Sequence, residues 1–184
     1  WIIQNIVLTG SVFARCYHYI NHFGLAYKRI GVIFFLLAVL IGLITVYLKV
    51  KRIKTVRYLW RVNLLSVFIL LNGLTFFNWD VLIAKYNITN YKQSYVHFIY
   101  LSHLSDSALF ALKIPSEHLE HISKLQKEKY NCPNLERSPL NINGEEFQKR
   151  IQSRIETFKQ KWENTHWLEW NYAEHFCYKQ LHNQ

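Results

Sequence analysis

The feature that most constrains this chain is a run of 19 residues without a charge, from Ile30 to Leu48. An α-helix rises about 1.5 Å per residue, so this run would be about 28 Å long and would match the hydrocarbon thickness of a bilayer. A helix that is apolar on every face is typical of a membrane span. The run is long and internal and lacks a small-residue cleavage site, which excludes a signal peptide. We predict a transmembrane helix over residues 30–48.

A second uncharged run of 18 residues, Val62–Trp79, predicts a second transmembrane helix. It contains Asn63 and Asn72, whose amides are costly in hydrocarbon unless they are hydrogen-bonded. We expect Asn72 to bond to a neighbouring helix. A polar site for transport is the alternative.

The charges divide the sequence into two parts. All 12 acidic residues lie between Asp80 and Glu174, whereas residues 1–79 contain nine basic residues and no acidic one. Short loops rich in Lys and Arg stay in the cytoplasm. We therefore predict a cytoplasmic loop at residues 49–61. Lys28 and Arg29, before the first span, favour the opposite orientation, but they are only two charges. Residues 80–184 are then placed outside the cytoplasm. The loop contains six basic residues: Lys49, Lys51, Arg52, Lys54, Arg57 and Arg61.

The position of this positive charge also bears on partners. It lies beside the predicted spans, where aromatic residues such as Tyr58 and Trp60 are typical of the membrane interface. This favours the lipid bilayer as a partner and disfavours a nucleic acid.

Residues 1–24 carry apolar side chains at nearly helical spacing and end at Gly24, a residue type that often closes a helix. We expect a helix that either lies along the membrane interface or forms the end of a further span. The chain contains no Met. We therefore also expect the natural protein to have more spans before residue 1.

After residue 80 the pattern changes to short amphipathic helices. Residue types that favour a helix start precede three apolar groups: Ser105 or Asp106, Pro115 with Ser116, and Asn171. The clearest stripe is Phe147, Ile151, Ile155, Phe158 and Trp162. Together these patterns predict an all-α chain, with two membrane spans and an N-terminal membrane helix followed by a small helical extramembrane domain over residues 80–184.

Few side chains have the spacing of a metal or catalytic site. His118 and His121 lie one helical turn apart and could bind a metal ion with a third ligand, but a solvated helix face is the simpler interpretation. None of the signatures HExxH, Walker A, GxSxG, GxGxxG or CxxC occurs. We therefore assign no catalytic residue, metal or cofactor.

Asp80 and Asn87 follow directly on the second apolar run. The simpler interpretation of Asp80 is that its carboxylate caps the next helix or pairs with Lys85. The functional alternative is a polar site at the membrane interface, made by Asn72, Asp80 and Asn87 with residues from helices before residue 1.

Two of the three cysteines, Cys132 and Cys177, fall in the domain placed outside the cytoplasm. A disulfide between them would close a loop of 46 residues, counting both ends. Cys177 also fits the apolar stripe of its helix as a small buried side chain, and we favour that interpretation.

Several segments in this order resemble a known family. The most specific are DVLIAKYN at residues 80–87, LSHLSDSALFAL at residues 101–112, and Trp170 followed by Asn171. The chain is similar to the C-terminal half of a bacterial multi-pass membrane family that is known only as a domain of unknown function. In that family Pro often precedes the equivalent of Asp80, where this chain has Trp79. The resemblance implies an inner-membrane protein with further N-terminal helices, and it implies no activity.

Two functions fit these observations. The first is a non-catalytic membrane component whose helical extracytoplasmic domain packs on protein partners or on further helices of the same protein. The second is a membrane-embedded enzyme or transporter whose site is completed by N-terminal helices absent from this chain. In the second case the polar side chains should converge on one cavity, and in the first each should be bonded locally. We favour the first.

Overall fold

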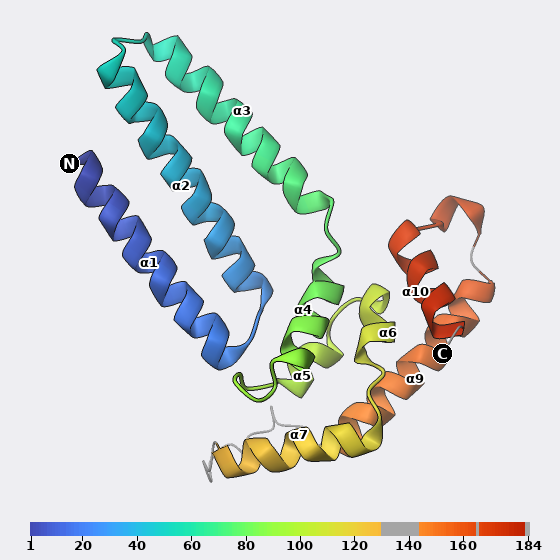
Figure 1. Cartoon of the computed structure of the whole chain (residues 1–184). Coiled ribbons are helices and arrows are strands. Elements are labelled where there is room, and N and C mark those ends of the chain that lie inside the picture. The colour runs from blue at the N-terminus through green and yellow to red at the C-terminus, as the bar shows by residue number, and fades with distance from the viewer. Residues whose placement is uncertain (130–143, 165, 183–184) are drawn as a thin grey trace. The chain divides into compact units, whose positions relative to one another are not determined.

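The chain consists of two compact helical units. The computed structural model describes residues 1–129, 144–164 and 166–182, and divides them into unit 1 (Trp1–Phe77) and unit 2 (Asn78–Gln184) (Figure 1). Every regular element in the described residues is a helix. The all-α prediction is therefore confirmed.

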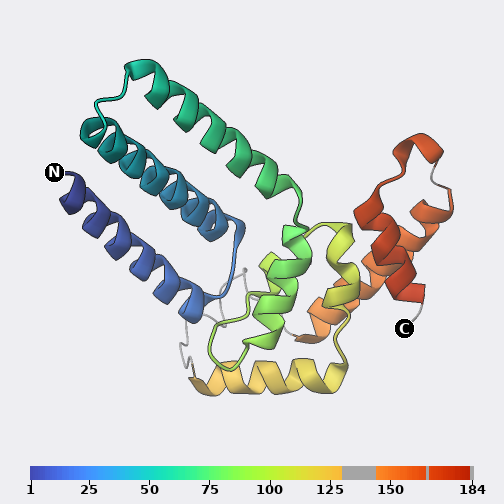
Figure 2. The ribbon, with the colours of Figure 1, turned by 45° about the horizontal axis from the view of Figure 1, so that its top comes forward.

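Unit 1 contains three long helices, α1 (Ile2–Phe23), α2 (Tyr27–Lys51) and α3 (Val56–Thr75). They run alternately up and down, and α2 packs against both α1 and α3 (Figures 1 and 2). Gly24 closes α1 as predicted: its φ of 75° lies in the left-handed region, and its N–H donates to Ile20 O at 2.9 Å.

Both of the predicted long apolar helices are present, with different ends. α2 and α3 are long and apolar enough to cross a bilayer, but α2 is longer than residues 30–48, and α3 begins and ends earlier than residues 62–79. The predicted loop 49–61 is thereby reduced to a connection of four residues, Arg52–Thr55. Lys and Arg are good helix formers, so the helices continue through the basic residues.

The surface of α3 is consistent with a span. None of its residues is buried, and large apolar side chains such as Leu64, Leu65 and Phe68 are exposed. A soluble helix would keep such residues inside a core, whereas lipid can cover them.

Unit 2 is built around α9 (Gly144–Glu163), which contacts α5 (Phe98–Ser102), the 3₁₀ helix η1 (Asp106–Ala108), α6 (Leu109–Leu112) and α7 (Ser116–Lys129). α4 (Trp79–Thr89) packs on η1 and α6. α10 (Tyr172–His182) packs on the same two elements and follows a second 3₁₀ helix, η2 (Trp167–Glu169).

The predicted stripe of α9 forms the centre of this unit. Phe147, Ile151 and Phe158 are buried, and the Phe147 ring lies 5.1 Å from that of Phe98, measured between centroids. Ile155 and Trp162 are half-buried, and Trp162 stacks on Tyr178 of α10. The helix prediction is confirmed, and its apolar face joins elements that are distant in the sequence.

Candidate functional site

The first turn of α4 is capped by Asn78, and the prediction that Asp80 caps it is wrong. Asn78 Oδ1 accepts a hydrogen bond from the N–H of Val81 at 3.3 Å. Trp79 is then the first residue of the helix. Pro is generally favoured at this position, and it is frequent there in the resembled family. In this chain the helix starts at the same position with Trp in place of Pro. Lys85 lies over the Phe110 ring at 5.6 Å.

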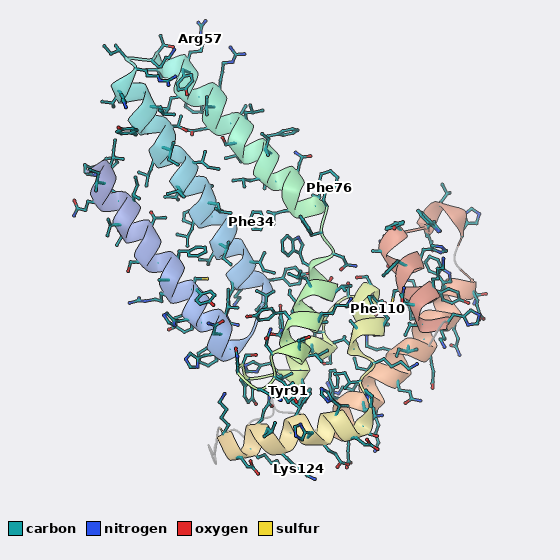
Figure 3. All side chains as sticks on the ribbon, in the orientation of Figure 1. Phe34, Arg57, Phe76, Tyr91, Phe110 and Lys124 are labelled. Carbon is teal, nitrogen blue, oxygen red and sulfur yellow. The ribbon has the colours of Figure 1, made fainter. Side chains whose placement is uncertain are left out.

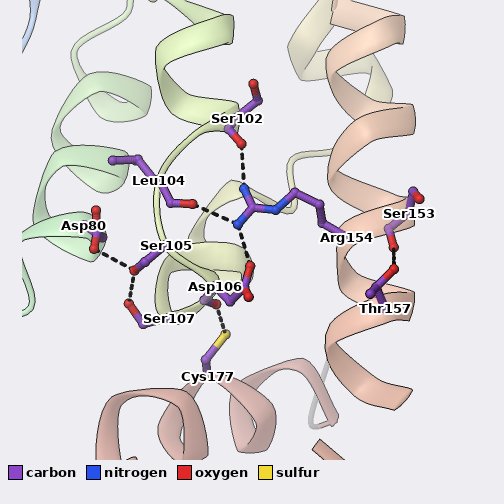
Figure 4. A network of polar contacts seen from close by, with 10 residues as sticks. All are labelled: Asp80, Ser102, Leu104, Ser105, Asp106, Ser107, Ser153, Arg154, Thr157 and Cys177. Atoms are coloured by element: carbon purple, nitrogen blue, oxygen red, sulfur yellow. Dashed lines mark hydrogen bonds and ion pairs between the residues drawn. The ribbon is translucent and has the colours of Figure 1, made fainter. Parts of the chain in front are cut away.

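Asp80 does not cap α4, and its side chain bonds instead to the segment between α5 and α6. Its Oδ2 accepts from the Ser105 hydroxyl at 2.6 Å (Figure 4). The Ser107 hydroxyl lies 2.7 Å from that of Ser105 and 3.3 Å from Asn78 Oδ1. A hydroxyl carries one proton, and Ser105 gives its proton to Asp80, so the single proton of Ser107 is shared between two acceptors, Ser105 Oγ and Asn78 Oδ1. Ser105 precedes η1 as predicted, but its side chain makes no cap.

Arg154 of α9 holds the other side of the same segment. Its guanidinium donates to the carbonyl oxygens of Ser102 at 2.5 Å and Leu104 at 2.9 Å, and forms an ion pair with Asp106 (Figure 4). Both charged side chains are about one third exposed, at 31% and 36%. The planar fork of Arg suits such several-fold bonding, and these bonds fix the segment to α9.

Cys177 of α10 completes the network from a third element. Its thiol donates to the Asp106 carbonyl at 3.1 Å, and the residue is completely buried. Burial raises the pKa of the Cys177 thiol, against the lowering effect of backbone hydrogen bonds from Phe110 and Leu109. The thiol is thus kept protonated and unreactive at neutral pH. Cys177 is a free thiol, and Cys132, its partner in the alternative disulfide, lies outside the described residues.

The two candidate metal ligands contact an aromatic ring. His118 and His121 both lie edge-to-face with Tyr91, at centroid distances of 5.1 and 5.9 Å. In the described part of the chain, no group of three or more His, Cys, Asp or Glu side chains is arranged to hold a metal ion. The pair therefore packs α7 against Tyr91 in the turn that follows α4.

The polar residues of the predicted interface site are divided between the two units: Asn72 belongs to unit 1, and Asp80 and Asn87 belong to unit 2. Asn72 donates to Phe68 O of its own helix at 2.7 Å, and its expected bond to a neighbouring helix stays a prediction. Asn87 is buried within unit 2. Of the three candidates, Asp80 is the one that joins the network.

Arg154 and Ser107 were not singled out by the sequence, and Ser105 was singled out only as the start of a helix. The partners in the Arg154 contacts are 48 to 52 residues apart, which no local pattern can indicate. The one available signal was the specificity of the segment LSHLSDSALFAL, which contains every residue of α5, η1 and their connection that the network uses.

Comparison with known proteins gives one match. The family model described as "Domain of unknown function (DUF4153)" matches residues 1–113, which cover more than half of the chain and include Asp80 and the segment from Leu101 to Leu112. No curated protein and no solved structure matches the chain. The chain belongs to the family of the domain of unknown function DUF4153.

Proposed function

We propose that this chain is a non-catalytic membrane component: unit 1 anchors it in the inner membrane of a bacterium, and unit 2 packs on partner proteins at the extracytoplasmic side. The helices α2 and α3 support the anchor. The six basic residues at their connected ends support the orientation, because such segments stay in the cytoplasm.

The observation that carries the non-catalytic role is how the polar groups of unit 2 are bonded. Asp80, Ser105, Asp106, Arg154 and Cys177 bond to one another or to backbone carbonyls, and each bond joins two different elements of the fold or two residues of one turn. A catalytic site would leave an acid, base or nucleophile directed at a substrate. Side chains that are mutually satisfied act as structural links.

Exposed apolar side chains near the C-terminal end of unit 2 support docking on partner proteins. Four large apolar side chains of η2, α10 and their connection are exposed, at 71%, 54%, 71% and 43%: Leu168, Trp170, Tyr172 and Phe176. We call them the aromatic surface. Trp and Tyr are enriched at protein interfaces, because they bury a large area with little loss of side-chain entropy.

The docking role is tested by the size of the complex that the chain forms in its native membrane. The full chain should run in mild detergent as an assembly larger than the chain with its micelle, and Trp170→Ser with Tyr172→Ser should reduce it to the chain alone. The matched control, Lys124→Ser with Glu128→Ser, changes two exposed residues of α7 without changing the net charge and should keep the assembly.

Cys177 serves as the folding check in both variants, since its buried thiol should stay unreactive. A folded aromatic-surface variant that keeps the full assembly size would show that the docking role is wrong. The docking role would also be wrong if the parent chain itself had only the size of one chain with its micelle.

The orientation is tested by labelling single cysteines with a reagent that cannot cross the membrane. Cys16 and Cys177 are buried and should not react, so replacing Cys132 with Ser gives a parent chain without a reactive cysteine. In intact cells Lys127→Cys should be labelled, and Lys54→Cys should react only after the membrane is opened. Both positions are exposed. Labelling of position 54 in intact cells would reverse the proposed topology.

A further inference from the structure

A groove with one charged end runs along α3. It has a volume of about 950 Å³, within the range of small-molecule sites. Its charged end is made by Arg57 and Arg61, which lie one turn apart, and its apolar length includes Leu65, Phe68 and Leu71. Arg57 lies where α3 is connected to α2 (Figure 3).

The two arginines have no carboxylate to neutralise them within their unit. Residues 1–79 contain no Asp or Glu, and both arginine residues are exposed. No ion pair of either one is found in the described parts of the chain. Arg is always charged at physiological pH. In the proposed topology the carboxylates of residues 80–184 lie on the other side of the membrane, so the anion that matches this end of the groove comes from another molecule.

We infer that this groove binds one anionic phospholipid, with its phosphate between Arg57 and Arg61 and an acyl chain along Leu65, Phe68 and Leu71. The inference rests on the proposed function, in which the basic end of α3 lies at the cytoplasmic leaflet. That leaflet is rich in anionic lipids, which attract basic residues at the ends of spans.

The combination of charge and shape favours a lipid over other occupants. A second copy of unit 1 would bring the basic ends of two chains, neither of which has an acidic residue in this unit, against each other. Like charges in contact disfavour such an assembly. Free phosphate would satisfy the arginines and leave the apolar length of the groove uncovered. A phospholipid satisfies both ends.

The test measures lipid binding to the full chain in neutral detergent by native mass spectrometry. The probes are phosphatidylglycerol, phosphatidylcholine with the same acyl chains, and inorganic phosphate. We expect one phosphatidylglycerol to bind more tightly than phosphatidylcholine and to resist competition by phosphate. Arg57→Gln with Arg61→Gln should weaken its binding roughly ten- to thirtyfold.

The matched control is Arg52→Gln with Lys54→Gln. It removes the same charge from the adjacent connection and leaves the groove lining intact. Its binding should stay within a few-fold of the parent. Equal weakening in the two variants, equal affinity for the two lipids, or full competition by phosphate would each overturn the lipid site.

A separate measurement distinguishes the lipid site from the anchoring on which it rests. The chain is reconstituted in vesicles and extracted with alkaline carbonate. A chain that resists extraction but does not distinguish the lipids overturns the lipid site alone. A chain that is extracted overturns the membrane anchor and the lipid site together.

Discussion

Replacing Phe147 with Ala is expected to lower the free energy of unfolding of unit 2 by about 3–5 kcal/mol. The side chain is completely buried and its ring packs on Phe98 at 5.1 Å. Truncation removes the transfer energy of the ring and leaves a cavity between α9 and α5. A domain of this size is stabilised by only about 5–15 kcal/mol, so the loss is a large fraction of the total.

The measurement is the temperature at which Cys177 becomes reactive to a thiol dye, in a background in which Cys16 and Cys132 are replaced by Ala. We expect Phe147→Ala to lower this temperature by well over 10 °C. The control is Phe176→Ala, since Phe176 is 43% exposed and contacts Phe110 by a ring edge. Equal shifts in the two variants would show that α9 is not the centre of unit 2.

Arg154→Met is expected to destabilise unit 2 by about 2–4 kcal/mol. The change removes donors to the Ser102 and Leu104 carbonyls and leaves the Asp106 carboxylate without its cation. The estimate lies below that for a fully buried pair because both side chains are about one third exposed. Arg154→Lys should lose less, since one ammonium keeps the charge but cannot span three acceptors.

Two further variants make this prediction specific. Arg150→Met, one turn away, removes an exposed pair with Glu146 at 2.8 Å and should change stability by less than about 0.5 kcal/mol. Asp106→Asn combined with Arg154→Met should recover part of the loss, because it removes the unpaired charge. If Arg154→Met and Arg150→Met changed the temperature at which Cys177 becomes reactive by the same small amount, the bonds of Arg154 to its three acceptors would not stabilise unit 2.

The long apolar helices of unit 1 and the helices of unit 2 were predictable because their signals are local. An uncharged run of 19 residues and a stripe from Phe147 to Trp162 depend only on neighbouring residues. The errors at helix ends had local causes too: the helices continue through Lys49, Lys51, Arg57 and Arg61, and Asn78, a favoured N-cap residue, starts α4.

The polar network was not predictable, because its bonds join distant segments. Asp80 and Ser105 are separated by 25 residues, and Asp106 and Arg154 by 48. A carboxylate after an apolar run indicates a cap by local rules, and a nearby chain segment then competes for the same oxygen. Only the fold decides which partner is closer. The resemblance singled out residues 80–87 and 101–112, but it did not indicate that Asp80 in the first segment bonds to Ser105 in the second.

The position of α9 bears on the order in which the protein forms during synthesis. The family model ends at residue 113, yet α5 within that segment packs on Phe147, and the turn after α5 is held by Arg154. These partners leave the ribosome later. Until α9 has been made, Phe98 of α5 therefore lacks the ring on which it packs, and this part of the matched segment cannot complete its core. A nascent chain stalled before residue 144 should be the form that chaperones and proteases recognise.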